Sequence, residues 1–210
     1  MRVGILTGGG DAPGLNAVIY GALLQAYRHE DIEVIGIKKG WKIFAMEKSK
    51  ITPDIIEKFT EKLDIGKLDD LQIKGGTILY STRSNPFKAV GKIADKQEKE
   101  RKTKEIGEDL AEKMNILNLD ALITVGGDDT LGVSAAMYEY GKAHVVGCPK
   151  TIDNDLSGTD YTFGFFSGAQ LASNTLENLN TTAGSHQRIF VVEVMGRDAG
   201  WLTLYSGLSA

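Results

Sequence analysis

The chain has 210 residues, of which 42% are hydrophobic and 25% charged, and its formal net charge is −4 at pH 7. Such a composition is ordinary for a soluble globular protein. The acidic balance argues against nonspecific nucleic-acid binding, and no apolar run approaches the roughly 18 residues of a membrane span. With Cys148 as its single cysteine, the chain forms no intrachain disulfide, so we expect a protein of the reducing cytoplasm that binds neither nucleic acid nor membrane.

Short runs rich in Ile and Val alternate with helical patterns from the first residues onward. This alternation predicts an α/β fold, with a mainly parallel sheet and helices on both of its faces. The stretch "GTDYTFGFF" interrupts it, which predicts one domain over residues 1–162 and the beginning of a second α/β domain over residues 163–210. The predicted strands are residues 3–7, 33–37, 121–125, 145–148 and 189–195, and the predicted helices are residues 16–29, 53–63, 96–114, 130–140 and 168–179.

Three of the predicted strands end in polar loops rich in glycine or aspartate. "TGGGDAPG" follows the first strand, "GGDDT" follows the strand at 121–125, and "PKTIDND" follows the strand at 145–148. Ligands of open α/β sheets bind at the carboxyl ends of the strands. The three loops therefore predict one convergent ligand site.

The first loop, "TGGGDAPGLN", has the features of an anion site. Its glycines expose backbone N–H groups, and Pro13 suits the first turn of a following helix, whose positive end attracts an anion. A tight strand-to-helix turn without a ligand explains the same residues. The P-loop pattern does not occur, and Pro13 stands where the dinucleotide pattern requires its last glycine, so a nicotinamide dehydrogenase lacks support.

The second loop places Asp128 and Asp129 side by side. Asp129 could cap a helix that begins near Thr130, but one aspartate is enough for that role. Asp128, at a strand end between glycines and a helix, is suited to hold Mg²⁺ through water or phosphate oxygens. A metal would also relieve the repulsion between the two carboxylates.

The third loop contains Lys150, Thr151, Asp153 and Asp155. On an extended segment, the last three of these side chains share one face, because strand side chains alternate. A Ca²⁺ loop is an alternative, although the closing glutamate of that twelve-residue pattern is missing. A carboxylate beside a metal-bound phosphate is suited to act as general base for a sugar hydroxyl.

The last motif, "SHQRIFVVEVMGRDAGW", has Arg188 before a predicted strand and Arg197 after it. The planar guanidinium group suits recognition of a phosphate monoester. Taken alone, an arginine in either place is more often a surface residue, and His186 alone more often has a structural role than a catalytic one.

Together with "STRSNPFK", these motifs resemble the phosphofructokinase family in order and spacing, over essentially the whole chain. The resemblance implies a phosphofructokinase-like fold, with a first domain that binds phosphate donor and Mg²⁺ and a second that begins the sugar-phosphate site. It implies transfer of a phosphoryl group to the 1-hydroxyl of fructose 6-phosphate, giving fructose 1,6-bisphosphate. The implied catalytic residues are Asp129, Lys150, Thr151, Asp153 and Arg197; the implied substrate-binding residues are Gly9, Arg83, Lys88, Thr151, Asp153, Arg188, Met195, Gly196 and Arg197; the implied metal residues are Asp128 and Asp155.

The donor that the resemblance implies is diphosphate. ATP-dependent members usually carry glycine where Asp129 stands, and many carry glycine where Lys150 stands. Two like charges 4 Å apart repel by about 4 kcal/mol at an effective dielectric near 20, so a carboxylate there disfavours the α-phosphate of a nucleotide. Because diphosphate is a low-energy donor, the enzyme would run in both glycolytic and gluconeogenic directions. The alternatives are an ATP-dependent phosphofructokinase that tolerates Asp129 and a noncatalytic module that binds phosphate or sugar phosphate.

The resemblance also has consequences for assembly. Arg188 would bind the 6-phosphate in a neighbouring subunit's site, which implies a homodimer or homotetramer. Members of the family continue beyond "LYSGLSA", with further sugar-phosphate ligands. We therefore expect this chain to expose apolar surface, and to associate or to be poorly stable alone.

Overall fold

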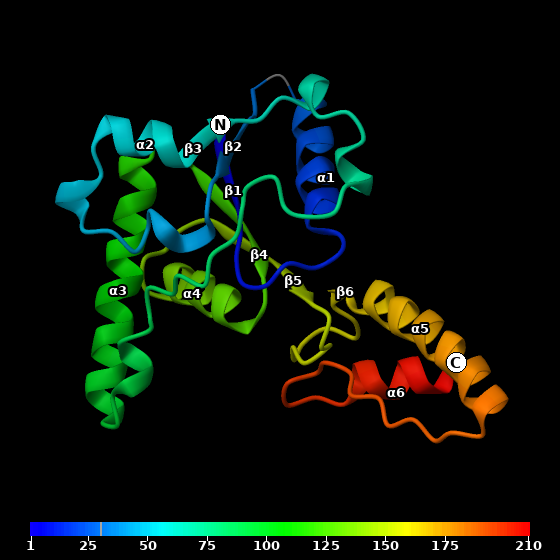
Figure 1. Cartoon of the computed structure of the whole chain (residues 1–210). Helices are drawn as coiled ribbons and strands as arrows, with labels where there is room; N and C mark the ends of the chain where they lie inside the picture. Colours follow the sequence, from blue (N-terminus) through cyan, green and yellow to red (C-terminus); the bar gives the residue numbers. More distant parts are fainter. Residues whose placement is uncertain (30) are drawn as a thin grey trace. The chain divides into compact units, whose positions relative to one another are not determined.

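The computed structural model describes residues 1–29 and 31–210 and has an α/β architecture (Figure 1). The chain divides into two compact units, Met1–Cys148 and Pro149–Ala210. The division lies inside β5, earlier in the chain than the functional boundary predicted after residue 162, which stays a prediction. The strands are β1 (Arg2–Thr7), β2 (Glu33–Ile37), β3 (Thr60–Lys62), β4 (Ala121–Gly126), β5 (Val145–Thr151) and β6 (Phe163–Gly164); the helices are α1 (Leu15–Tyr27), α2 (Pro53–Phe59), α3 (Lys96–Ile116), α4 (Asp128–Glu139), α5 (Phe165–His186) and α6 (Trp201–Leu208).

The strand order is β3-β2-β1-β4-β5-β6. Strand β1 runs parallel to both of its neighbours, with Ile5 opposite Gly36 of β2 and Ile123 of β4. Strand β3 is antiparallel to β2, and β5 pairs in parallel with β6. The predicted mainly parallel α/β sheet is confirmed, and the carboxyl ends of β1 and β4 meet at the same edge, where their loops follow.

The core of the first unit explains why these strands form. Leu6, Ile37 and Leu122 on the sheet pack in one cluster with Leu110 of α3 and Met137 of α4, all of them nearly or fully buried. Successive residues of a strand point to opposite faces, and both Ile5 and Leu6 are fully buried. Figure 1 shows α1 on one side of these strands and α3 with α4 on the other. Strands β1, β2 and β4 are thus covered on both faces, which is why they are continuously apolar.

The second unit has a smaller core between its two helices. Phe165 and Ala169 of α5 are buried against Leu202 of α6. The rings of Phe165 and Tyr205 meet edge to face, with centroids 5.0 Å apart. Val194, on the segment between the helices, packs against the same cluster.

The predicted helix over residues 53–63 is too long. Helix α2 ends at Phe59, and the next three residues form β3 instead. Thr60 adopts an extended backbone, pairs with Ile37 of β2, and donates its hydroxyl hydrogen bond to the Ile56 carbonyl at 2.7 Å. Pairing with a sheet edge overrides the helical pattern here.

The predicted strand over residues 189–195 is not a strand in the structure. Its side chains nevertheless alternate, since Ile189 and Val191 are 95% and 97% exposed, Val192 is 38% exposed and Val194 packs inward. Among the described residues no strand pairs with this segment. Its side chains therefore alternate as they do in a strand, but along the described chain its backbone makes no strand-to-strand hydrogen bonds. The predicted exposed apolar surface is confirmed here.

Across residues 1–29 and 31–210, none of the helices combines the length and apolarity needed to cross a lipid bilayer.

Candidate functional site

The loop after β1 is held by close packing against α4. The Gly8 amide donates a hydrogen bond to the Val125 carbonyl at 2.8 Å, which ties the loop to β4. A Cβ atom on Gly8 would lie 2.4 Å from Oγ1 of Thr130, so no larger residue fits without a shift. Gly9 follows in the left-handed region at φ 81°. The glycines are therefore required by geometry, and they bring Gly9 beside the start of α4.

Helix α4 begins at Asp128, which corrects the prediction that Asp129 could cap it. The N-cap is Gly127, without a side-chain cap, and both aspartates lie in the first helical turn. Carboxylates in a first turn are stabilised by the positive end of the helix dipole. Both side chains are exposed. The helix terminus thus offsets part of their mutual repulsion and leaves them accessible to a ligand.

A segment distant in sequence lies against these two loops. Ser81 donates its hydroxyl hydrogen bond to the Gly9 carbonyl at 2.5 Å, and the Asn85 side-chain amide donates to Oδ1 of Asp129 at 3.4 Å. The predicted residues Arg83 and Lys88 are exposed on this segment. The structure therefore brings the segment that carries Arg83 to Gly9 and Asp129 within one unit.

The sequence motif "STRSNPFK" contains Ser81 and Asn85, but neither residue is among the site residues predicted from the sequence. Asn85 also accepts a hydrogen bond from the Phe87 amide at 2.8 Å through its Oδ1 atom. That bond fixes the orientation of the side chain, so its NH₂ group faces Asp129. The signal was available, because Asn before Pro is typical of turns in which the side chain bonds the backbone two residues on.

This unit can bind a magnesium ion only if water and the oxygens of a bound phosphate complete the coordination shell. Among the described residues, no group of three or more His, Cys, Asp or Glu side chains is close enough to hold a metal. Mg²⁺ commonly uses one or two carboxylates and completes its shell with water and phosphate oxygens. Asp128, exposed in the first turn of α4, can supply one such carboxylate.

In the second unit, β5 extends to Thr151, so Lys150 and Thr151 are strand residues. Lys150 is buried and lies opposite Phe163 of β6. The expectation that residues 151, 153 and 155 share one face of an extended segment is wrong. Asn154 takes a left-handed backbone at φ 52°, and the Asp153 amide donates to Oγ1 of Thr151 at 3.1 Å, so the chain bends after the strand.

Asp153 lies at the electrostatic centre of this bend. Burial raises the pKa of its carboxyl group above the ordinary 3.8, and the neighbouring Asp155 carboxylate raises that pKa further, whereas Arg197 and Lys150 oppose the rise. Its Oδ1 atom is buried and has no hydrogen-bond partner among the described residues. The structure thus brings three of the predicted residues, Lys150, Asp155 and Arg197, around the Asp153 carboxylate, which is available to accept a proton.

Arg197 reaches this group from a tight turn. The Ala199 amide donates to the Gly196 carbonyl at 2.7 Å, and a Cβ atom on Gly196 would lie 2.1 Å from the Ala199 carbonyl oxygen. Arg197 has a left-handed backbone at φ 48°, and Met195 beside the turn is 72% exposed. Residues 195 to 197 are therefore presented by one constrained turn.

Arg188 is placed differently. It is exposed just after the end of α5, where its backbone amide donates to the Ala183 carbonyl at 2.9 Å. None of the interactions found among the described residues joins its side chain to Asp153. Its predicted role in the site of a neighbouring subunit stays a prediction.

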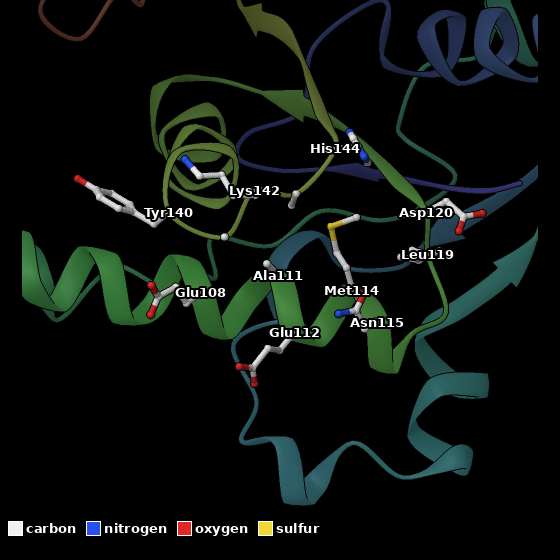
Figure 2. A pocket seen from close by; sticks show the side chains of 12 residues that line it. Glu108, Ala111, Glu112, Met114, Asn115, Leu119, Asp120, Tyr140, Lys142 and His144 are labelled. Carbon is white, nitrogen blue, oxygen red and sulfur yellow. The ribbon is translucent and has the colours of Figure 1, made fainter.

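A cavity of about 480 Å³ lies at the opposite edge of the sheet from the glycine and aspartate loops (Figure 2). Its walls come from α3 and from the turns that precede β4 and β5, so it lies at the amino ends of these strands. None of the predicted site residues lines it. The labelled side chains are Glu108, Ala111, Glu112, Met114, Asn115, Leu119, Asp120, Tyr140, Lys142 and His144.

Comparison with known proteins identifies relatives across the whole chain. The family model described as phosphofructokinase matches residues 2–210. The pyrophosphate–fructose 6-phosphate 1-phosphotransferase of Amycolatopsis methanolica is 44% identical over 209 residues, which are 100% of this chain and 54% of that protein. The ATP-dependent 6-phosphofructokinase 3 of Bacteroides thetaiotaomicron is 41% identical, over 100% of this chain and 56% of that protein.

The structural comparison agrees. The phosphofructokinase of Pichia pastoris in its T-state matches 99% of this chain and 21% of its own, with a TM-score of 0.75 and 30% identity. The chain spans about half the length of the curated relatives it matches.

Proposed function

The chain belongs to the phosphofructokinase family, and from this premise we propose that it carries out part or all of a reversible phosphoryl transfer from diphosphate to the 1-hydroxyl of fructose 6-phosphate. The products are fructose 1,6-bisphosphate and orthophosphate, in glycolysis and gluconeogenesis. The observation that carries the proposal is Asp153, whose buried Oδ1 atom has no hydrogen-bond partner within residues 1–29 and 31–210 and whose carboxylate lies in a group with Lys150 and Arg197.

The first unit would hold the donor. Gly9, Arg83 and Lys88 supply a backbone turn and two exposed cations for diphosphate oxygens. Asp128 would hold Mg²⁺, which when bound neutralises charge on the phosphate oxygens. Phosphoryl transfer depends mainly on positioning and on electrostatic stabilisation, which this combination supplies.

The second unit would hold the sugar phosphate. Asp153 would take the proton from the 1-hydroxyl of the sugar. The oxygen of that hydroxyl would form a bond to the transferred phosphorus, while the bond from this phosphorus to the bridging oxygen of diphosphate breaks and orthophosphate departs. Asp155 would support the metal and the base, and Thr151 would contact the sugar phosphate. Arg197 lies near enough to lower the pKa of Asp153, and would stabilise the negative charge of the transferring group.

The remaining residues of the sugar site follow the same proposal. Met195 and Gly196 would line it beside Arg197, on the tight turn. Arg188, exposed after α5, would bind the 6-phosphate in the site of a neighbouring subunit of a homodimer or homotetramer. Lys150 would add positive charge for diphosphate, and the protein would work in the cytoplasm.

Asp129 supports diphosphate as the donor. Its carboxylate lies in the first turn of α4 and is oriented by Asn85, so it would repel the α-phosphate of a nucleotide. Because the side chain is exposed, water and salt screen this repulsion. We therefore expect discrimination of about tenfold or more, rather than the full value for two unscreened charges.

ATP is the second candidate donor. The 41% identical relative from Bacteroides thetaiotaomicron is named an ATP-dependent enzyme, which favours this alternative.

The experiment is calorimetric titration of the 210-residue chain with Mg-diphosphate and with MgATP. We expect tighter binding of diphosphate, and a preference that falls about tenfold in Asp129→Gly. Asp129→Asn keeps the shape and removes the charge, so it should behave like the glycine variant. Asp69→Asn removes an exposed carboxylate elsewhere in the same unit and should leave the preference unchanged.

Tighter binding of MgATP by the unsubstituted chain would overturn the donor assignment. An unchanged preference in both Asp129 variants would remove Asp129 from donor selection. Binding of neither ligand would contradict the assignment of the first unit as the donor site.

A further inference from the structure

A pair of hydrogen-bonded side chains behind the Asp153 bend has no role in the function proposed above. Thr162, which is 1% exposed, donates its hydroxyl hydrogen bond to the Thr151 carbonyl at 2.7 Å. Its backbone amide donates to Oδ1 of Asn154 at 2.9 Å. The Asn154 amide group in turn donates to the Asp160 carbonyl at 3.4 Å. We call Asn154 and Thr162 the bend brace.

The brace holds a backbone conformation that is uncommon for a residue with a side chain. Asn154 lies in the left-handed region at φ 52°, which asparagine tolerates better than most residues. Such conformations persist where the surroundings hold them in place. Here the holding contacts come from Thr162, on the other side of the loop.

Asp153 stands between the two fixed points of the brace. The carbonyl of Thr151 is held by the Thr162 hydroxyl, and the side chain of Asn154 is held by the Thr162 amide. The Asp153 amide is itself bonded to Oγ1 of Thr151. Few backbone torsions remain free between these points, so the brace restricts the direction of the Asp153 Cα–Cβ bond, from which the carboxylate extends.

We propose that Thr162 and Asn154 are positioning residues that aim the Asp153 carboxylate at the sugar hydroxyl. This inference rests on the proposed function of the second unit. Neither side chain needs to touch the substrate. The Thr162 hydroxyl is not needed to pair β5 with β6, because the backbones of Thr151 and Gly164 already provide that pairing.

The experiment compares variants that keep or remove single contacts. Thr162→Val keeps the volume of the side chain and removes the hydroxyl, whereas Thr162→Ser keeps the hydroxyl. Asn154→Gly keeps access to the left-handed backbone and removes the amide group. The matched control is Thr175→Val, since the exposed Thr175 hydroxyl donates to the Leu171 carbonyl within α5, away from the bend.

Two measurements are made on each variant of the 210-residue chain. Calorimetric titration with fructose 6-phosphate measures binding, and amide hydrogen exchange at Asp153 and Thr162 measures the order of the bend without ligand. We expect Thr162→Val and Asn154→Gly to weaken binding about three- to tenfold, the usual worth of one hydrogen bond. Exchange at Asp153 should become faster in both variants, with α5 unaffected. Thr162→Ser and Thr175→Val should stay within about twofold of the unsubstituted chain.

Unchanged exchange at Asp153 in Thr162→Val would overturn the inference, because the brace would then not order the bend. Faster exchange with unchanged sugar-phosphate binding would also overturn it, because the ordered bend would not matter for the ligand. If the unsubstituted chain binds no fructose 6-phosphate, the proposed function of the second unit fails, and the exchange data alone decide whether the brace orders Asp153.

Discussion

Different kinds of contact stabilise the loops of the two units. In the first unit, Gly8 and Gly126 leave no room for a side chain because Thr130 packs directly against both. In the second unit, the bend at Asp153 is held by hydrogen bonds from Thr162 and Asn154. Packing of small residues gives a rigid loop that presents backbone groups, whereas hydrogen-bonded side chains fix the direction of a particular carboxylate.

The aspartates of the two units also differ in their surroundings. Asp128 and Asp129 are exposed and lie at the positive end of α4, which stabilises them. Asp153 is half-buried and has a raised pKa, and its Oδ1 atom meets no hydrogen-bond partner in the part of the chain that the structure describes. The first unit therefore suits binding of an anion through its backbone and helix field. The second unit holds one carboxylate in an unfavourable state, as catalytic bases require.

The largest loss of stability is expected from a substitution at the carboxyl end of β4, which packs against Thr130. A Cβ atom on Gly126 would lie between 2.5 and 2.7 Å from three atoms of the Thr130 side chain. Thr130 is buried, so it has little room to move. We expect Gly126→Ala to lower the free energy of unfolding by about 1–3 kcal/mol, measured by urea denaturation.

Gly132 provides the control for this prediction. It lies in the same helix as Thr130, and a Cβ atom there would meet nothing within 4 Å. Gly132→Ala should be stabilising by about 0.5–1 kcal/mol, since alanine is the better helix former. The double variant Gly126→Ala, Thr130→Ala should recover part of the loss. A loss of the same size in both alanine variants would contradict the role of close packing.

A smaller effect on stability is expected from substitution of Asp153, and it should be stabilising rather than destabilising. Its pKa is raised in the folded chain, so the folded state holds the proton more tightly than the unfolded state does. The stabilisation from this group is present below the ordinary pKa of 3.8 and is lost as the pH rises through the folded pKa. At pH 7 the carboxylate therefore destabilises the fold.

Asp153→Asn should for this reason raise the midpoint of thermal unfolding at pH 7 by about 1–3 °C, while abolishing phosphoryl transfer where the full reaction can be assayed. The gain should shrink as the pH falls toward the raised pKa. Asp155→Asn removes one cause of the rise and should give a smaller gain. A lower midpoint at pH 7 in Asp153→Asn would show that Arg197 and Lys150 outweigh burial.

Much of the first unit could be predicted from the sequence because its signals are local. Buried strands are short Ile and Val runs, and the glycines before α4 mark the carboxyl end of β4. The bend of the second unit depends on a contact that lies outside its own motif. The bend after Thr151 is stabilised by Thr162, and no local pattern in "PKTIDND" indicates it. Residues 189–195 have the pattern of a strand, but a pattern does not supply a partner strand.

The smallest effect is expected at Asn85, the one polar side chain seen to connect the "STRSNPFK" segment with the α4 aspartates in the described part of the chain. Its hydrogen bond to Asp129 is long, at 3.4 Å, and partly exposed. Asn85→Ala should change the free energy of unfolding by less than about 0.5 kcal/mol and reduce the preference for diphosphate over ATP about twofold. Calorimetric titration with both donors measures the second quantity.

The effect of Asn85 should depend on Asp129, because the asparagine acts by orienting that carboxylate. In an Asp129→Gly background, Asn85→Ala should therefore cause no further change in donor preference, as expected for coupled residues. Asn85→Asp keeps an oxygen for the Phe87 amide and places a second carboxylate against Asp129, so it should weaken diphosphate binding more than alanine does. Additive effects of Asn85→Ala and Asp129→Gly would mean that the asparagine acts on donor preference independently of Asp129. Donor selection would then depend on the "STRSNPFK" segment as well as on the charges at the start of α4, and the hydrogen bond between Asn85 and Asp129 would not be the link between them.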